Sequence, residues 1–166
     1  MYLGIDIGGS KTLLAGFSEQ GQITAEAKFA TPADYNDFLA LLESNLQQQP
    51  FKDVAISHCC CAVPGEIDRS RGVGLTLGNL PWENKPVKDD LSKILPGATV
   101  LVENDSNLAG LSEALLVHDK YKKVLYLTIS TGIGDGIIIN GIIDPSFADS
   151  ESGQAVLNYG GELHKW

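Results

Sequence analysis

Two short glycine-rich segments hold the residues best suited to binding an anion, GGSKT at 8–12 and TGIGDG at 131–136. Glycine leaves backbone N–H groups open and lets a ligand approach where a Cβ would clash, and such a concave set of donors suits phosphate. In the first segment Lys11 adds a point charge, while Ser10 and Thr12 add hydroxyl donors. One glycine turn by itself usually only reverses the chain, whereas two that face each other could hold the β- and γ-phosphates of a nucleotide.

Two carboxylates lie where they could serve this chemistry. Asp6 precedes the first glycine turn, in an apolar stretch where an unpaired carboxylate costs free energy. Mg²⁺ bound with the phosphates, through water, would account for it, and so would a hydrogen-bonded structural Asp at a strand end. Asp105 follows an apolar strand and opens a helix, a place where ligands gather in α/β sheets. It could accept a proton from a substrate hydroxyl or simply cap the helix, and Asn104 beside it could bind sugar hydroxyls or shape a turn.

The composition disfavours several classes of protein. A chain of 166 residues is about one domain long. Twelve Lys and Arg against 21 Asp and Glu give a net charge of −9, which disfavours sequence-independent binding to nucleic acid or to an anionic membrane. The apolar runs are too short to span a membrane, and Asp6 interrupts the N-terminus before the apolar region of a signal peptide could form. We therefore expect a cytoplasmic protein.

The three cysteines are consecutive, at 59–61. In a strand neighbouring side chains point to opposite faces, so these three cannot share one metal ion. We expect them to behave as small apolar residues of a buried strand. His58, in the same apolar run, is expected to be a core residue rather than a ligand or a base.

The hydrophobic patterning predicts three antiparallel strands followed by alternating helices and strands, that is, an α/β layer on a mixed sheet. The expected elements are strands at 2–7, 12–17 and 23–30, a helix from 32–34 that ends before Pro50, a strand at 54–63 buried on both faces, an ordered loop region at 66–85 with at most a short strand, a helix at 87–95, a strand at 98–103 and a helix opened by Asp105.

After residue 119 the opening pattern begins again, with strands at 124–130 and 137–139 around the second glycine turn. An offset of 124 places Ile5 on Ile129 and Gly8 on Gly132. One recurrence of a glycine hairpin is weak evidence alone, but it suggests a duplicated lobe. We expect an N-terminal lobe at 1–118 and the start of a second, incomplete lobe at 119–166.

Five segments, taken in order, resemble the ROK family of bacterial sugar kinases and related repressors, within the actin-like ATPase superfamily. They are DIGGSKT at 6–12, AVPG at 62–65, NLPW at 79–82, ENDSNLA at 103–109 and STGIGDGIIING at 130–141. The resemblance covers nearly the whole chain. It implies a ribonuclease H-like lobe with a mixed five-stranded sheet, followed by the first strands of a duplicated lobe.

The resemblance also implies ATP-dependent phosphorylation of a sugar hydroxyl, with Asp105 as general base and Asp6 near Mg²⁺. The sugar-binding residues would be Gly65, Asn79, Asn104, Asp105 and Glu151. The residues that bind the ATP phosphates would be Gly8, Gly9, Ser10, Lys11, Thr12, Thr131, Gly132, Ile133 and Gly134. Glucose, fructose, mannose and N-acetyl sugars are all substrates within the family, and dimers are usual.

Two departures from the family's pattern bear on function. The E-x-G-H motif appears as ESGQ at 151–154, and no Cys follows residue 61. Because that His ligates a structural zinc in many members, we expect no zinc here. Family members are also roughly twice as long, so we expect an incomplete chain that is inactive alone. The alternatives are a non-catalytic sugar-binding regulator or a pseudoenzyme. ROK repressors carry a helix-turn-helix ahead of the first phosphate motif, which starts here at Asp6, and they tend to lose the phosphate motifs.

Overall fold

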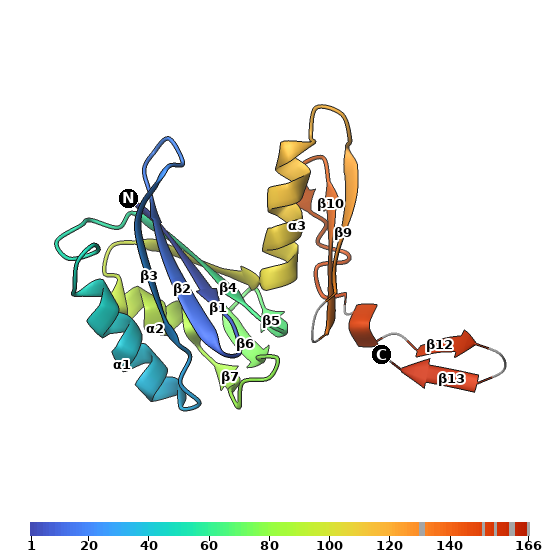
Figure 1. Ribbon diagram of the computed structural model, residues 1–166, viewed down its shortest axis with the longest axis horizontal. Coiled ribbons are helices and arrows are strands. Elements are labelled where there is room, and N and C mark those ends of the chain that lie inside the picture. The colour runs from blue at the N-terminus through green and yellow to red at the C-terminus, as the bar shows by residue number, and fades with distance from the viewer. Residues whose placement is uncertain (130–131, 151, 155, 160–161, 166) are drawn as a thin grey trace. The chain divides into compact units, whose positions relative to one another are not determined.

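The computed structural model describes residues 1–129, 132–150, 152–154, 156–159 and 162–165 (Figure 1). The chain forms two compact units, Met1–Asn104 and Asp105–Trp166. In the part of the chain that the structure describes, no helix is both long enough and apolar enough to cross a membrane.

A five-stranded mixed sheet forms the centre of the first unit, as predicted, in the order β3-β2-β1-β4-β8. Neighbouring strands β1, β2 and β3 are antiparallel, whereas β1, β4 and β8 run parallel. The antiparallel part follows from the short connections, and the parallel part from the helical crossovers. The strands are β1 (Tyr2–Ile7), β2 (Lys11–Phe17), β3 (Ile23–Ala30), β4 (His58–Val63) and β8 (Thr99–Asn104).

Helices α1 (Tyr35–Leu46) and α2 (Val87–Ile94) cover one face of this sheet (Figure 1). Asp34 begins α1 by accepting hydrogen bonds from two backbone N–H groups of the first turn. Alternate strand residues point toward the helices, so Leu3 of β1 is buried in the core while Tyr2 is 42% exposed.

The apolar run predicts a strand over 54–63 that is buried on both faces, but β4 begins only at His58 and buries one face. Asp53 adopts a positive φ of 63°, and the chain turns there before it enters the sheet. His58 is exposed and lies edge-on to the Tyr2 ring, 5.4 Å between centroids, so the prediction of a core histidine is wrong. Its position in the alternation places it on the face away from the helices.

The cysteines alternate as predicted. Cys59 and Cys61 are buried against the helices, whereas Cys60 points to the opposite face and is partly exposed. The three sulfur atoms therefore do not converge on one point.

Residues 66–85 form a small antiparallel sheet rather than a loop region, with strands β5 (Glu66–Asp68), β6 (Val73–Thr76) and β7 (Glu83–Lys85). The loop between β6 and β7 is anchored by Trp82, which is 1% exposed. Its ring centroid lies 5.2 Å from that of Tyr35 and 4.9 Å from that of Phe38. Its indole Nε1 donates to the Ala33 carbonyl at 2.8 Å. Trp82 thus fixes this loop to the start of α1.

The second unit contains a three-stranded antiparallel sheet in the order β11-β10-β9, against which α3 packs. This order repeats that of β3-β2-β1. The last paired residues before the two turns are Ile7 and Ile129. Ile129 therefore corresponds to Ile7 and not, as the sequence offset predicts, to Ile5. The elements are α3 (Asp105–Leu116), β9 (Lys123–Ile129), β10 (Ile133–Ile139), β11 (Ile142–Ile143), η1 (Ser152–Gln154), β12 (Val156–Tyr159) and β13 (Glu162–Lys165).

Along the chain, the boundary between the two units differs from the lobe boundary predicted after residue 118. Helix α3 groups with β9 and β10, which places the change of unit at Asn104 and Asp105. The division into lobes at 1–118 and 119–166 stays a prediction about the duplicated fold.

Candidate active site

The carboxyl ends of β1, β4 and β8 meet at one edge of the first unit's sheet. The parallel register pairs Asp6 with Ala62 and Val63 with Asn104. The first glycine turn, the turn at Gly65 and the last residue of β8, Asn104, are therefore neighbours within the first unit. Ligands of open α/β sheets bind at such an edge.

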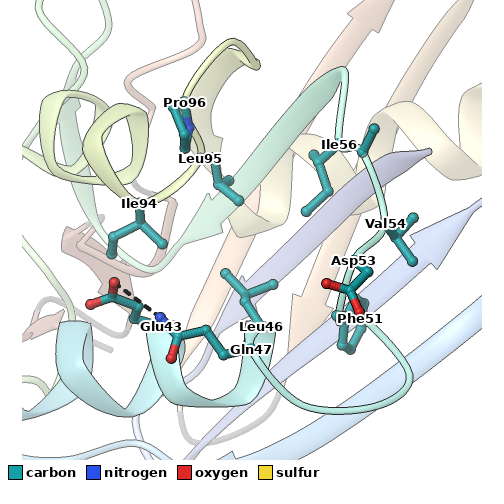
Figure 2. A pocket seen from close by; sticks show the side chains of 11 residues that line it. Glu43, Leu46, Gln47, Phe51, Asp53, Val54, Ile56, Ile94, Leu95 and Pro96 are labelled. Carbon is teal, nitrogen blue, oxygen red and sulfur yellow. Dashed lines mark hydrogen bonds between the residues drawn. The ribbon is translucent and has the colours of Figure 1, made fainter.

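The first unit also contains an open cavity of about 320 Å³ at a different place (Figure 2). Its lining residues come from the ends of α1 and α2 and from the segments that lead into β4 and β8, hence from the amino ends of these parallel strands. Glu43 and Gln47 on its wall are joined by a hydrogen bond of 3.3 Å. It lies at the opposite end of the sheet from the predicted site residues.

Hydrogen bonds from Thr31 hold the first glycine turn in place. The Thr31 hydroxyl donates to the Gly8 carbonyl at 2.8 Å, and the Thr31 N–H donates to the Ser10 carbonyl at 3.1 Å. The Gly8 N–H closes the turn by donating to Lys11 O at 3.0 Å. Thr12 is fully buried, with its hydroxyl 2.9 Å from that of Thr31. Thr12 therefore supports the turn from inside, and Ser10 and Lys11 remain exposed to a ligand.

Asp6 is exposed, because β1 points it away from the core that Ile5 and Ile7 enter. Among the described residues no three His, Cys, Asp or Glu side chains gather around one point. A single carboxylate beside the turn predicted to bind phosphate fits Mg²⁺, which is usually held by one or two carboxylates, water and substrate phosphates. Asp6 is the residue that would hold it.

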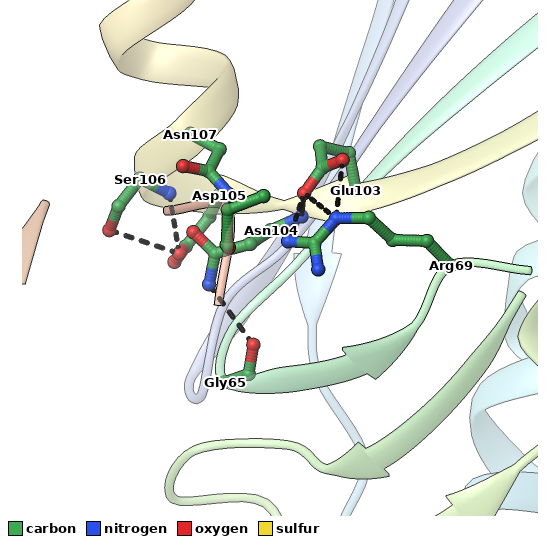
Figure 3. Close-up of polar contacts among 8 residues, drawn as sticks. Gly65, Arg69, Glu103, Asn104, Asp105, Ser106 and Asn107 are labelled. Carbon is green, nitrogen blue, oxygen red and sulfur yellow. Dashed lines mark hydrogen bonds and ion pairs between the residues drawn. The ribbon is translucent and has the colours of Figure 1, made fainter. Parts of the chain in front are cut away.

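Three predicted sugar-binding residues lie close to this turn in the first unit. Gly65 has φ +87°, and a Cβ there would overlap the Thr76 carbonyl, so only glycine fits. Its own carbonyl accepts from Asn104 Nδ2 at 3.0 Å (Figure 3). Asn79 is exposed and lies beside the glycine turn, since a Cβ built on Gly9 would be 3.8 Å from that of Asn79.

An ion pair that the sequence analysis missed stands next to these residues (Figure 3). Arg69 Nη2 donates to Glu103 Oε1 at 2.7 Å, and Arg69 Nε donates to Oε2 at 2.9 Å. Glu103 Oε1 also accepts from the Asn104 N–H at 2.8 Å. A glutamate at the end of an apolar strand needs a cation or hydrogen-bond donors, so the position of Glu103 in the sequence could have indicated such a partner.

In the second unit, the start of α3 packs directly on β10, because the structure places Gly134 and Gly136 of the predicted glycine turn in this strand. A Cβ on Gly134 would overlap the Ser106 hydroxyl, and one on Gly136 would lie 2.9 Å from the Ser106 carbonyl. Asp105 Oδ1 accepts from the Ser106 N–H at 2.7 Å and from its hydroxyl at 3.3 Å. Asp105 Oδ1 is thus held by the residue that follows it, and Ser106 is the residue of this pair that contacts β10.

Asp135, within the second glycine segment, is a buried carboxylate that the sequence analysis did not single out. It accepts from the Ser150 hydroxyl and from the Ser152 N–H. Burial opposes its charge, but these hydrogen bonds from Ser150 and Ser152 outweigh burial and hold the pKa of Asp135 below its usual value. Its side chain is directed to Ser150 and Ser152.

The remaining predicted residues of the second unit are only partly described. Gly132 is exposed and Ile133 begins β10. Thr131 and Glu151 lie outside the described residues.

The chain matches the ROK family over residues 2–145. It is 33% identical to the N-acetyl-D-glucosamine kinase of Haemophilus influenzae (strain 86-028NP), with 96% of this chain and 53% of that protein covered. It is 31% identical to the glucokinase of Halalkalibacterium halodurans, over 86% of this chain and 45% of the relative. A ROK glucokinase from Streptomyces griseus, solved with glucose and AMPPNP, superposes with a TM-score of 0.75 at 28% identity, over 86% of this chain and 46% of that one. The chain spans about half the length of these relatives.

Proposed function

The chain belongs to the ROK family, and we propose that the whole protein is an ATP-dependent sugar kinase that phosphorylates a hydroxyl of a hexose or an N-acetylhexosamine. One observation carries this proposal. The glycine turn after β1, Asn79, and the hydrogen-bonded pair Gly65–Asn104 lie at the same sheet edge, where the chain continues into Asp105. A phosphate-binding turn and hydroxyl-binding side chains at one edge are what a sugar kinase requires.

The reaction assigns a separate task to each group. The Asp105 carboxylate takes the proton of the sugar hydroxyl while the hydroxyl oxygen forms its bond to the γ-phosphorus. The bond between this phosphorus and the β–γ bridging oxygen breaks, and ADP leaves with the electron pair. Backbone N–H groups of the turn and Lys11 stabilise the negative charge on the phosphates. Phosphoryl transfer has a loose transition state, so that positioning and charge stabilisation supply most of the catalysis.

Magnesium would be held at Asp6 and would supply charge neutralisation on the phosphates. ATP as donor is supported by the relative from Streptomyces griseus, which was solved with AMPPNP. N-acetylglucosamine and glucose are the first sugars to test, because the relatives include kinases named for both. Since ATP is the donor, we also propose that the protein acts in the cytoplasm, and that it forms a homodimer, which light scattering after size-exclusion chromatography tests.

The direct test measures ADP release and the ³¹P spectrum of the product for the whole protein with ATP, Mg²⁺ and a panel of hexoses and N-acetylhexosamines. We expect phosphorylation of at least one sugar. Sugar binding by calorimetry without any transfer would favour the non-catalytic reading, and no binding of any sugar would refute the proposal.

A further inference from the structure

Arg69 and Glu103 connect two segments that each carry a residue assigned to sugar binding. Arg69 follows β5, which begins directly after the turn at Gly65, and Glu103 precedes Asn104 in β8. The ion pair is one link between these segments, and the hydrogen bond from Asn104 Nδ2 to Gly65 O is a second. Two links between the same two segments hold the end of β8 against the Gly65 turn (Figure 3).

The pair also acts on the backbone. Glu103 Oε1 accepts from both Arg69 Nη2, at 2.7 Å, and the Asn104 N–H, at 2.8 Å. The guanidinium is planar and presents its donors as a fixed fork, so it determines the orientation of the carboxylate that it holds. The orientation of the peptide before Asn104 therefore depends on Arg69.

We propose that Arg69 is a positioning residue of the active site, acting through Glu103 on Asn104 and, along the chain, on Asp105. The inference rests on the proposed kinase function and extends it to a residue outside the set assigned to sugar and phosphate binding. The side chains of Arg69 and Glu103 are 27% and 16% exposed, so the pair is more shielded than a surface ion pair and its geometry is better fixed.

The chain offers a matched control two residues away. Arg71 is 73% exposed and lies 3.9 Å from Asp68. Replacing Arg69 or Arg71 by Met removes the same charge from the same short segment, but only R69M removes the contact to Glu103.

We would compare R69M, R71M, R69K and the double variant R69M/E103Q in the full-length protein, measuring kcat, the KM for sugar and the KM for ATP. We expect R69M to lower kcat/KM for the sugar about 10- to 100-fold, because small misplacements of catalytic groups cost that much. The KM for ATP should stay within about twofold of wild type, since the glycine turn is untouched. R71M should behave as wild type, and R69K, which keeps the charge without the fork, should fall between.

The double variant separates positioning from the burial of an unpaired charge. R69M alone leaves Glu103 shielded without this partner, which by itself lowers stability. R69M/E103Q removes that charge, so its melting temperature should return toward the wild-type value while kcat stays low. Full recovery of kcat in the double variant would overturn the positioning role.

Hydrogen exchange at the Asn104 amide gives a readout that does not depend on turnover. Loss of Arg69 should speed this exchange about tenfold, and R71M should leave it unchanged. Unchanged exchange and unchanged kcat in a folded R69M protein would overturn the inference while the kinase function stands. A wild-type protein that phosphorylates no sugar would instead overturn the function, even if R69M still loosens the Asn104 amide.

Discussion

Gly134 and Ser106 approach so closely that a β-carbon on the glycine would overlap the Ser106 hydroxyl. The start of β10 and the first turn of α3 are thus packed against each other without space for a side chain. Gly134 can therefore serve this packing as well as the phosphate contact that the sequence predicts for it.

Replacing Gly134 by Ala should push the start of α3, which carries Asp105, away from β10. Overpacking of this kind costs about 1–3 kcal/mol in the free energy of unfolding, measured by urea denaturation. Gly132 is the control, because a Cβ there meets nothing within 4 Å and G132A should leave stability nearly unchanged. Equal stability of both variants would show that α3 does not need this close approach.

Replacing Asp105 by Asn removes the proposed base and keeps the side-chain oxygen that accepts from the Ser106 N–H. We expect kcat to fall about 10²- to 10⁴-fold, the usual contribution of a general base. Sugar affinity by calorimetry and the melting temperature should change little, because the hydrogen bond from the Ser106 N–H can be retained. Turnover close to wild type would remove Asp105 from the role of base.

Replacing Thr31 by Val should loosen the first glycine turn. The variant loses the hydrogen bond to Gly8 O and leaves the fully buried Thr12 hydroxyl without its 2.9 Å partner. A buried hydroxyl left unpaired costs about 1–3 kcal/mol, so urea unfolding should show that loss and the KM for ATP should rise. T31S keeps the hydroxyl and should restore both. An unchanged KM for ATP in T31V would show that the Thr31 hydrogen bonds do not contribute to phosphate binding.

The strands of the central sheet and its helices could largely be predicted from hydrophobic patterning because each is a local signal, whereas the start of β4 and the short strands β5, β6 and β7 could not. The three-strand meander and the helix that Asp34 begins need only alternation, helical spacing and a capping residue. Alternation could also have placed Thr12 inside, since it points to the same face as Leu14. The pair Arg69–Glu103 could not be located in this way, because it depends on where a three-residue strand meets β8, and no local pattern specifies that.

Metal analysis of the folded full-length protein should find no stoichiometric zinc. The thiolate is the form of cysteine that binds metal. Burial, and to a smaller extent the nearby Cys60, raises the pKa of Cys59 to about 12. Burial also raises the pKa of Cys61 well above its ordinary value, and Cys60 points to the other face. The usual family histidine is replaced by Gln154. Zinc at one ion per chain that dialysis against a chelator removes, with a loss of stability, would contradict this prediction.

The charge of Asp135 should make the second unit sensitive to acid. Its pKa is held below the unfolded value of about 4 by the hydrogen bonds from Ser150 and Ser152. The ionised form is therefore favoured by folding, so its stabilisation is fully present above about pH 4 and is lost as the pH falls through the lower folded value. Replacing Asp135 by Asn removes this dependence because an amide does not titrate, although its single oxygen can accept only one of the two bonds that Oδ1 and Oδ2 of Asp135 accept. Melting temperatures measured between pH 3 and pH 7 should converge for wild type and D135N at the acid end and diverge, with wild type higher, toward neutrality. Parallel curves across that range would show that Asp135 does not contribute to the pH dependence of folding.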